Sequence, residues 1–464
     1  MNVKSPTQVF LALVLLIGAH IARPGIAHAQ DVKSCPDLLK NAHKTFECVE
    51  GIFSEDPVHG TFSSIPPGNG FPLGIVYEDA VHHVGEYKSL TDPTLALVGS
   101  TNGSWYTTGS LIWLPPVPYT DTSRNGASCH KLGPLCTKEV FGINVYGTHR
   151  NLNSLSFFGL GNTPAGTQYN FKEKDTYGGI TLRMPITNWL GVDGQIEGRA
   201  PSLPSTSASN SVNVNFAEAT APGLVDQPIF LHSAVSIRTN ATRIAERATN
   251  PLAAVATAPM PLMKGRTVFR FENNAGYHWY QDTRTGLYSF QQMVFDGNES
   301  IQFGSVLQRF VEPGTSWIVS HLCDGNKVDD TCDFGTLYVK SWFSFANVGA
   351  THTMPFYFQP TIGGSDIDSR ESLRAFDNYR FRDRNAAVVQ LEIARTIKDP
   401  LGAFLFYDGG MVGRVVSDLS SSPFRQDGGV GVSLRLNGNV VARGFLAAGA
   451  GDGVKFGYNF SKFF

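Results

Sequence analysis

Charged residues are scarce in this 464-residue sequence. Lys, Arg, Asp and Glu together make up 16% of it, and the formal net charge at pH 7 is −2. Nucleic-acid-binding surfaces need a clustered excess of basic side chains, so this balance argues against a nucleic-acid partner. Beyond the N-terminal leader, no segment approaches the roughly 18 consecutive apolar residues of a membrane-spanning helix. Helical membrane spans are therefore excluded.

Short enzyme motifs are also missing. The sequence has no Gly-x-Ser-x-Gly, no His-Glu-x-x-His and no phosphate-binding glycine-rich loop with a lysine. The neighbouring His82 and His83 are better interpreted as exposed residues near a strand end than as a catalytic pair. Scattered Ser and His residues can still meet in a folded protein, but no pattern favours this. We expect no enzymatic activity and no cofactor.

The N-terminus has the parts of a secretory signal peptide. Lys4 supplies a basic residue, residues 9–17 form an apolar run, and Ala29 ends a small-residue cleavage site. The apolar run is too short to cross a bilayer as a helix. The predicted division of the chain is a signal peptide at 1–29, a short periplasmic or lumen-plugging segment at 30–70, and the main domain at 71–464.

The six cysteines fall into three close pairs along the chain. In an exported protein, close pairing favours small disulfide loops. Metal binding is the alternative, and it has little support because there is no Cys-x-x-Cys and no histidine at ligand spacing. We therefore predict no metal site. The predicted disulfides join Cys35 with Cys48, Cys129 with Cys136, and Cys323 with Cys332.

Glycine and aromatic residues, in contrast, are abundant, with 48 glycines and an aromatic content of 11%. Low charge combined with many aromatics suits strands that face lipid and end in aromatic girdles. A soluble all-β protein can have a similar composition. Composition alone therefore leaves both classes open, and the pattern along the strands has to decide.

Two segments between residues 385 and 410 alternate with a period of two. Their apolar faces hold Val389, Leu391 and Ile393 in the first segment and Ala403, Leu405 and Tyr407 in the second. The opposite faces hold Val388, Gln390, Glu392 and Ala394 in the first and Phe404, Phe406 and Asp408 in the second. Such alternation is typical of a strand between two different solvents. In an outer-membrane barrel these are lipid and a polar lumen, so Glu392 and Asp408 are predicted to point inward.

The run TIGGSDIDSRESLRAFDNYRFRDRNAAVVQLE, residues 361–392, resembles the signature of the BamA/TamA superfamily of bacterial surface-antigen barrels. Members have a Val/Leu-Arg-Gly-Phe motif in a loop that folds back into the barrel. The arginine of that motif pairs with the aspartate of a later Phe-x-Asp-x-Gly motif. The corresponding segments here are 373–376 and 406–410, with Ala375 in place of the motif glycine. If that position needs a positive φ, alanine would strain the loop tip.

The resemblance implies a latch between the loop and the inner wall of the barrel. Its members would be Arg374 with Asp408 and Glu392, supported by Leu373, Phe376, Phe406 and Gly410. A guanidinium inside a barrel loses bulk water, and a bidentate carboxylate restores its hydrogen bonds. The alternative is that Arg374 is a solvated lumen residue, which the Phe-x-Asp-x-Gly match disfavours. The sequence does not assign partners to the other loop charges, Arg380, Arg382, Asp383 and Arg384.

Other segments predict strands and loops. Asn102-Gly103 lies between alternating flanks and predicts a two-residue hairpin turn. Residues 200–225 are rich in Ser, Ala, Pro and Asn without periodicity, and predict a long surface loop. The aspartates of segment 323–333 could bind Ca²⁺, but the segment lacks the glycine and closing glutamate of a calcium-hand loop. A disulfide-tied, solvated loop is the simpler interpretation.

The C-terminal segment VKFGYNFSKFF places aromatic residues on one face of a final strand: Phe456, Tyr458, Phe460 and Phe464. A terminal aromatic on such a strand resembles the signal by which outer-membrane barrels are recognised for insertion. An ordinary final strand with one apolar face is the alternative. The predicted signal peptide favours the membrane interpretation.

We therefore expect a closed antiparallel transmembrane β-barrel, because only a closed barrel satisfies every strand's backbone in lipid without helices. The resemblance implies sixteen strands, the outer membrane of a Gram-negative-type bacterium, and a role in protein insertion or translocation. Its partners would be outer-membrane lipid, unfolded outer-membrane clients and a periplasmic accessory protein. The last is expected because residues 30–70 are too short for a polypeptide-transport-associated (POTRA) domain.

The resemblance also implies a mechanism, in which a weakly paired seam between the first and last strands opens sideways. The predicted seam lies between residues 71–79 and 454–464. An under-bonded strand edge is a template for another strand, so the mechanism is physically reasonable. A passive pore or structural surface barrel that keeps the latch for stability is the alternative, and lipid export is a third hypothesis.

Overall fold

The computed structural model describes residues 58–61, 65–78, 82–84, 89–114, 141–162, 166–187, 189–245, 267–302, 335–398, 401–421, 423–436, 439–449 and 452–460. The predicted signal peptide, the 323–333 segment and Phe464 lie outside these ranges. Within them, no helix is both long and apolar enough to cross a bilayer.

The three predicted disulfides also lie outside the described residues, and their pairing therefore stays a prediction. This holds for Cys35 with Cys48, for Cys129 with Cys136, and for Cys323 with Cys332.

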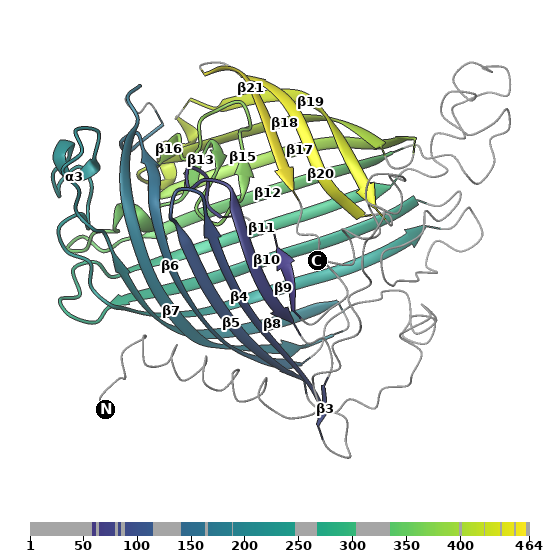
Figure 1. Ribbon diagram of the computed structural model, residues 1–464, viewed down its shortest axis with the longest axis horizontal. Helices are drawn as coiled ribbons and strands as arrows, with labels where there is room; N and C mark the ends of the chain where they lie inside the picture. Colours follow the sequence, from purple (N-terminus) through teal and green to yellow (C-terminus); the bar gives the residue numbers. More distant parts are fainter. Residues whose placement is uncertain are drawn as a thin grey trace, which may run out of the picture.

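The described chain is almost entirely β-structure (Figure 1). Its principal strands are β1 (Val58–Thr61), β2 (Pro72–Glu78), β3 (His82–Val84), β4 (Ser89–Ser100), β5 (Trp105–Leu114), β6 (Gly142–Phe157), β7 (Tyr169–Pro185), β8 (Leu190–Ser202), β9 (Phe230–Ala245), β10 (Thr267–Asp282), β11 (Phe290–Gln302), β12 (Thr336–Asn347), β17 (Asn385–Lys398), β18 (Leu401–Gly413), β19 (Arg425–Leu436), β20 (Asn439–Gly449) and β21 (Gly453–Phe460). Within the described residues, the short helices outside the inner loop are α3 (Val212–Asn215) and the 3₁₀ turn η5 (Val416–Ser420).

These strands form one continuous sheet of 17 strands in which sequence neighbours pair antiparallel. Because β2 and β3 pair one after the other with the same strand, β4, the sheet is sixteen strands wide when they are counted together. The predicted all-β antiparallel architecture is thus confirmed, and the width equals the strand number that the resemblance implied. The predicted Asn102-Gly103 turn joins β4 to β5, and Gly103 has a φ of 78°.

The sheet begins earlier in the chain than the sequence pattern indicated. Residues 58–61, predicted to belong to the leader segment, form β1 and pair with residues 74–77 of β2. Four residues are too few for a period-two pattern to stand out, so no sequence signal marked this strand. The predicted seam shifts accordingly. Within the described residues, β1 covers the edge of β2, and the two ends of the sheet are β1 and β21.

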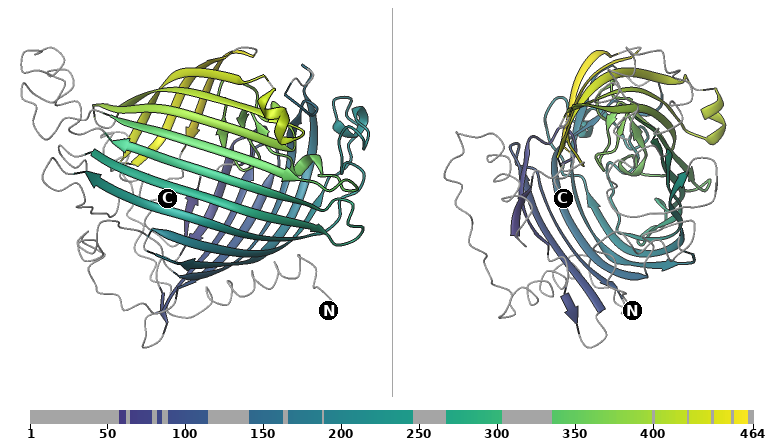
Figure 2. Two further views of the ribbon diagram at one scale, coloured as in Figure 1. Left: turned by 180° about the vertical axis from the view of Figure 1, so that it is seen from behind. Right: turned by 90° about the vertical axis from the view of Figure 1, so that its right-hand side faces the viewer.

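The sheet curls around an interior, and the segment between β12 and β17 lies inside the curve (Figure 2). Among the described residues, the pairings run from β1 through to β21, and no ladder joins these two strands to each other. The sequence predicted a closed barrel, whereas the sheet formed by the described residues is not closed and has two ends, β1 and β21.

The outer face of the sheet is apolar, as the alternation predicted. Leu391, Ile393 and Leu405 are 41%, 54% and 58% exposed, whereas Phe404 and Asp408 on the opposite face are buried. The predicted face assignments of β17 and β18 are therefore confirmed. A soluble protein would bury such a continuous apolar face, so the surface is the kind that a lipid-facing wall requires.

A charge on this outer face is expected to destabilise the protein in a bilayer. Leu405→Arg should lower the free energy of unfolding by about 2–4 kcal/mol if the position lies near the bilayer midplane, and by less near the interface. The matched control is Asn274→Arg, because Asn274 lies on the inward face of β10 and lines a polar cavity. Denaturant unfolding in liposomes measures both variants, and equal losses would contradict the assignment of the faces.

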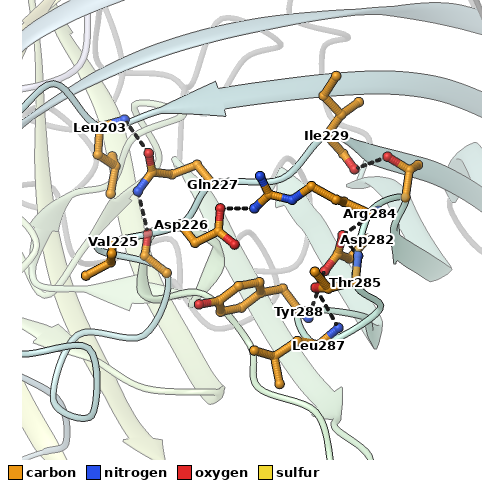
Figure 3. Close-up of polar contacts among 12 residues, drawn as sticks. Leu203, Val225, Asp226, Gln227, Ile229, Asp282, Arg284, Thr285, Leu287 and Tyr288 are labelled. Carbon is orange, nitrogen blue, oxygen red and sulfur yellow. Dashed lines mark hydrogen bonds and ion pairs between the residues drawn. The ribbon is translucent and has the colours of Figure 1, made fainter.

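Loops close over one end of the sheet, at the end where α3 lies in Figure 1. Residues 200–225, predicted as a long surface loop, lie mostly in the connection between β8 and β9 and contribute to a hydrophobic cluster in which Val212 and Ala221 are fully buried. Figure 3 shows how this connection is fastened to the β10–β11 turn. Arg284 pairs with Asp226, and the hydroxyl of Thr283 donates to the carbonyl of Ile229 at 2.8 Å. The predicted loop is therefore present as the connection between β8 and β9, and the burial of Val212 and Ala221 is the feature that the sequence did not indicate.

Candidate functional site: the inner-loop latch

The inner loop, residues 348–384, leaves the sheet after β12 and returns at β17. It is built from a 3₁₀ turn, η4 (Phe356–Phe358), and two small ladders: β13 (Thr361–Ile362) with β16 (Phe381–Arg382), and β14 (Gly364–Ser365) with β15 (Glu371–Ser372). Gly364 has a φ of 57°, and a Cβ there would lie 2.2 Å from Oδ1 of Asn378. The Gly-Gly pair of the sequence is therefore required for the loop to fold back on itself.

The structure brings Arg374, Asp408 and Glu392 together. The Nε and Nη2 atoms of Arg374 donate to the two carboxylate oxygens of Asp408 at 2.8 and 2.9 Å, and Nη1 donates to Glu392 at 3.2 Å. The backbone N–H of Arg374 also donates to Asp408 at 3.3 Å. Asp408 has no exposed surface, and Arg374 is 7% exposed. This bidentate, buried pair is the strongest form of a charged hydrogen bond.

Ala375 fits the loop tip without strain. The described residues with positive φ outside glycine are Ser369, Leu373 and Tyr379, so Ala375 does not need the conformation that only glycine adopts easily. Its side chain is buried in an apolar cluster, and its N–H donates to Asp427 at 2.9 Å. The strain that the sequence placed at residue 375 lies instead at Leu373, where φ is 45°.

The apolar members of the latch pack on both sides of the ion pair. Leu373 and Phe376 belong to one buried cluster with Trp342 and Val388 of the wall. Phe406 belongs to a second cluster and lies under the guanidinium of Arg374, with 3.5 Å between the Cζ atom and the ring centroid. This geometry adds a cation–π contact to the hydrogen bonds.

Glycine residues make room for the aromatic ring that lies beneath Arg374 of the latch. Gly429 of β19 pairs with Phe406, and a Cβ at this position would lie 2.5 Å from the Phe406 ring and 2.1 Å from the carbonyl oxygen of Leu446. At Gly410, the last residue of the Phe-x-Asp-x-Gly motif, a Cβ would lie 2.9 Å from the carbonyl oxygen of Ala387 and 3.3 Å from Ile362 of the inner loop. These contacts explain part of the high glycine content, because small residues let the rings and the loop approach the wall.

The structure also gives partners to Arg370, Arg380 and Arg382 of the loop, and the sequence had left Arg380 and Arg382 without an assigned partner. Arg370 pairs with Asp296 at 3.4 Å and covers the ring of Trp342, and Arg380 pairs with Asp452 at 3.3 Å. Arg382 donates to the carbonyl of Phe356 at 2.6 Å among aromatic rings, and burial lowers its pKa to about 10. The loop is therefore held to several parts of the wall at once.

Sequence reasoning missed a second buried charge cluster on the opposite part of the wall. Arg150 of β6 donates to Glu173 and Asp175 of β7 at 2.8 and 3.2 Å, and Arg199 of β8 pairs with Asp175 at 2.6 Å. These residues lie on strands, and they belong to no recognised sequence motif. The four charged residues lie on the inward faces of three neighbouring strands. This arrangement can be recognised only once the pairing of the strands is known.

Asp366, at the turn between β14 and β15, makes the loop sensitive to pH. Burial raises its pKa to about 7, the charge of Asp368 adds to this, and Arg370 opposes it. Because the folded pKa lies above the usual value of 3.8, the loop gains stability at low pH and loses it as the pH rises through about 7. The N–H groups of Asp368 and Arg370 donate to Asp366 at 2.9 and 2.8 Å, and they report on this turn.

We expect hydrogen-exchange protection of these two amides, corrected for intrinsic rates, to be about a hundredfold higher at pH 5 than at pH 8, because pH 5 lies about two units below the folded pKa. Asp366→Asn should remove the dependence while leaving the turn folded. Protection that rises with pH in the unmodified protein would contradict the assignment.

A polar cavity of about 480 Å³ borders the inner loop. Its lining includes Arg238, Glu272, Lys340 and Arg370. Within the described part of the chain, no group of three His, Cys, Asp or Glu side chains is placed to hold a metal ion. Of the predicted C-terminal signal, Phe456 and Tyr458 are 71% and 64% exposed on the outer face, and the side chain of Phe460 lies outside the described atoms.

The fold and the latch together define a class: a large antiparallel sheet of the outer-membrane-barrel type, with an inner loop fixed by a buried arginine–aspartate pair. Among solved structures, the chain is similar to BamA from Haemophilus ducreyi lacking POTRA domains 1–3, with a TM-score of 0.50 and 12% identity, covering 87% of this chain and 70% of that one. CdiB from Escherichia coli and from Acinetobacter baumannii match with TM-scores of 0.46 and 0.43 at 10% identity. They cover 88% and 87% of this chain and 62% and 59% of their own.

No protein-family model matches the sequence, and no curated protein matches it. The structural likeness to BamA shows the fold, which is the barrel fold that the loop motif implied.

Proposed function

We propose that this protein is an outer-membrane barrel that assists the insertion of other outer-membrane proteins, or their passage across the membrane, through a lateral seam. The seam would lie between β1 and β21. The observation that carries the proposal is the absence of a ladder between these two strands within the described sheet, while every other neighbouring pair is hydrogen-bonded.

In a bilayer, such edges need partners. An unpaired strand edge in lipid leaves backbone N–H and C=O groups without hydrogen bonds, at a cost of several kcal/mol each. The two edges can pair with each other, which closes the barrel, or each can pair with a strand from another protein. The short β1 contributes only four described ladder positions, so closure through it is weaker than at the other strand boundaries.

The apolar outer face and the aromatic last strand support placement in an outer membrane. The chemistry of the seam favours partners that present an unpaired, amphipathic strand, as an unfolded barrel protein does. A periplasmic accessory protein that delivers such clients is part of the proposal.

A passive pore is the second candidate, and the polar cavity beside the inner loop favours it. The packing of the loops opposes it. The inner loop and residues 203–229 share a buried aromatic cluster that includes Phe157, Phe356 and Tyr379, and this cluster lies across one end of the interior. An open, wide channel requires this cluster to separate.

The two candidates predict different results in liposomes. An unfolded client barrel should fold faster into liposomes that contain this protein than into liposomes that contain an unrelated closed barrel of similar size. The same liposomes should show little steady ion conductance. No acceleration together with steady conductance would reject the proposal and favour the pore.

A further inference from the structure

The tip of the inner loop reaches the last hairpin of the sheet. Asp452, in the turn between β20 and β21, accepts the backbone N–H of Asp377 and pairs with Nε of Arg380, each at 3.3 Å. Lys455 of β21 points inward and pairs with the carboxylate of Asp377. Three polar contacts therefore tie the loop tip to the final strand, at a site separate from the Arg374 latch.

The same loop tip also reaches the beginning of the sheet. The hydroxyl of Tyr379 donates to the carbonyl of Pro67, in the connection between β1 and β2, at 3.4 Å. That connection is itself fixed, because the fully buried Asn69 accepts hydrogen bonds from the hydroxyl of Ser104 at 2.7 Å and the N–H of Ser154 at 3.0 Å. Residues 377–380 thus lie between the two ends of the sheet.

The loop tip has a specified shape. Tyr379 has a φ of 61°, which a bulky residue adopts only when its surroundings impose it. Asp452 and Arg380 are 16% and 14% exposed in their side chains, so solvent screens their attraction only partly. Because the backbone of the loop tip is well defined and its charges are partly buried, the contact can hold the loop tip and the last hairpin in place.

We propose that residues 377–380 form a clasp across the seam, with Asp452 as the positioning residue that holds the last hairpin. The clasp joins β21 to the β1–β2 connection from the inside, although no ladder joins the strands themselves. Breaking it frees the end of the seam near the loops while the Arg374 latch keeps the inner loop in place. The inference rests on the proposed seam, but its test needs no client.

Spin labels can follow the separation of the two sides. Leu73→Cys on β2 and Val454→Cys on β21 place labels at outward positions that are 60% and 74% exposed, in a chain whose six native cysteines are replaced by serine. In Asp452→Asn, we expect the ratio of separated to close label populations to rise about tenfold, the effect of losing one charged hydrogen-bond contact. Asp452→Glu, which keeps the carboxylate, should restore most of the close population.

Two controls separate a clasp from general damage. Asp226→Asn removes an ion pair with Arg284 in the same loop-covered end but away from the seam, and it should leave the distance distribution unchanged. Protease resistance of the inner loop should stay as in the unmodified chain, because the latch remains. An unchanged distribution in Asp452→Asn, or release of the whole inner loop, would overturn the clasp. A failure of client insertion with an intact clasp would count against the proposed function alone.

Discussion

Arg374→Ala is expected to lower the free energy of unfolding by about 3–5 kcal/mol, the cost of leaving a buried carboxylate without its partner. The substitution removes three side-chain hydrogen bonds of the arginine. Asp408, which has no exposed surface, then keeps the amide of Gln390 at 3.1 Å and the backbone N–H of residue 374 as donors, and neither of these donors is cationic. Denaturant unfolding in liposomes measures the loss, and limited proteolysis detects release of the inner loop.

A double-mutant cycle with Asp408→Asn isolates the pair. The two single variants should each be costly, and the double variant should cost much less than their sum. Arg284→Ala is the matched control, because that arginine pairs with Asp226 on an exposed loop and should change stability little. Additive losses at residues 374 and 408, or an equal loss at 284, would show that the buried pair does not hold the loop.

Gly429→Val is the second substitution with a large expected effect. Its Cβ would overlap the Phe406 ring and the backbone oxygen of Leu446, so the ring must move away from beneath Arg374. Overpacking costs typically about 1–3 kcal/mol, and loss of the cation–π contact adds about 0.5–2 kcal/mol. We therefore expect a loss approaching that of Arg374→Ala, although residue 429 touches no charged group of the latch.

Gly444→Ala on the neighbouring strand is the control for this prediction, because no atom lies within 4 Å of the position that its Cβ would take. Unfolding in liposomes compares the two variants. Shrinking the ring should recover part of the loss, so Gly429→Val combined with Phe406→Leu is expected to be more stable than the sum of the single changes. Equal stability of the two glycine variants would mean that the ring does not depend on this space.

The sequence predicted the parts of the molecule that local pattern controls. Alternation at 389–393 and 403–408 assigned both faces of β17 and β18 correctly, because the period of a strand is a local property. The resemblance around residues 373–376 and 406–410 led to the residues that the structure brings together in the latch. In both cases the prediction rests on a short segment whose own residues form the pattern or the motif.

The remaining features depend on contacts between distant segments. β1 is visible only through its pairing with β2, and residues 203–229 are ordered only because Val212 and Ala221 pack against the inner loop. The partners of Arg370 and Arg380 come from β11 and the β20–β21 turn, which are far from the loop in sequence. The spacing of residues within the loop therefore could not predict these partners.

Locking the seam tests the central claim most directly. Cysteine pairs at Gly60 with Val454, or Val58 with Phe456, should form a disulfide when β1 and β21 pair antiparallel in one register, in a chain without native cysteines. The control pair, Ile237 with Ala275, joins strands already paired in the sheet. We predict that oxidation of a seam pair abolishes the acceleration of client folding and that reduction restores it, with no effect at the control pair. Full acceleration with the seam disulfide closed would contradict the account.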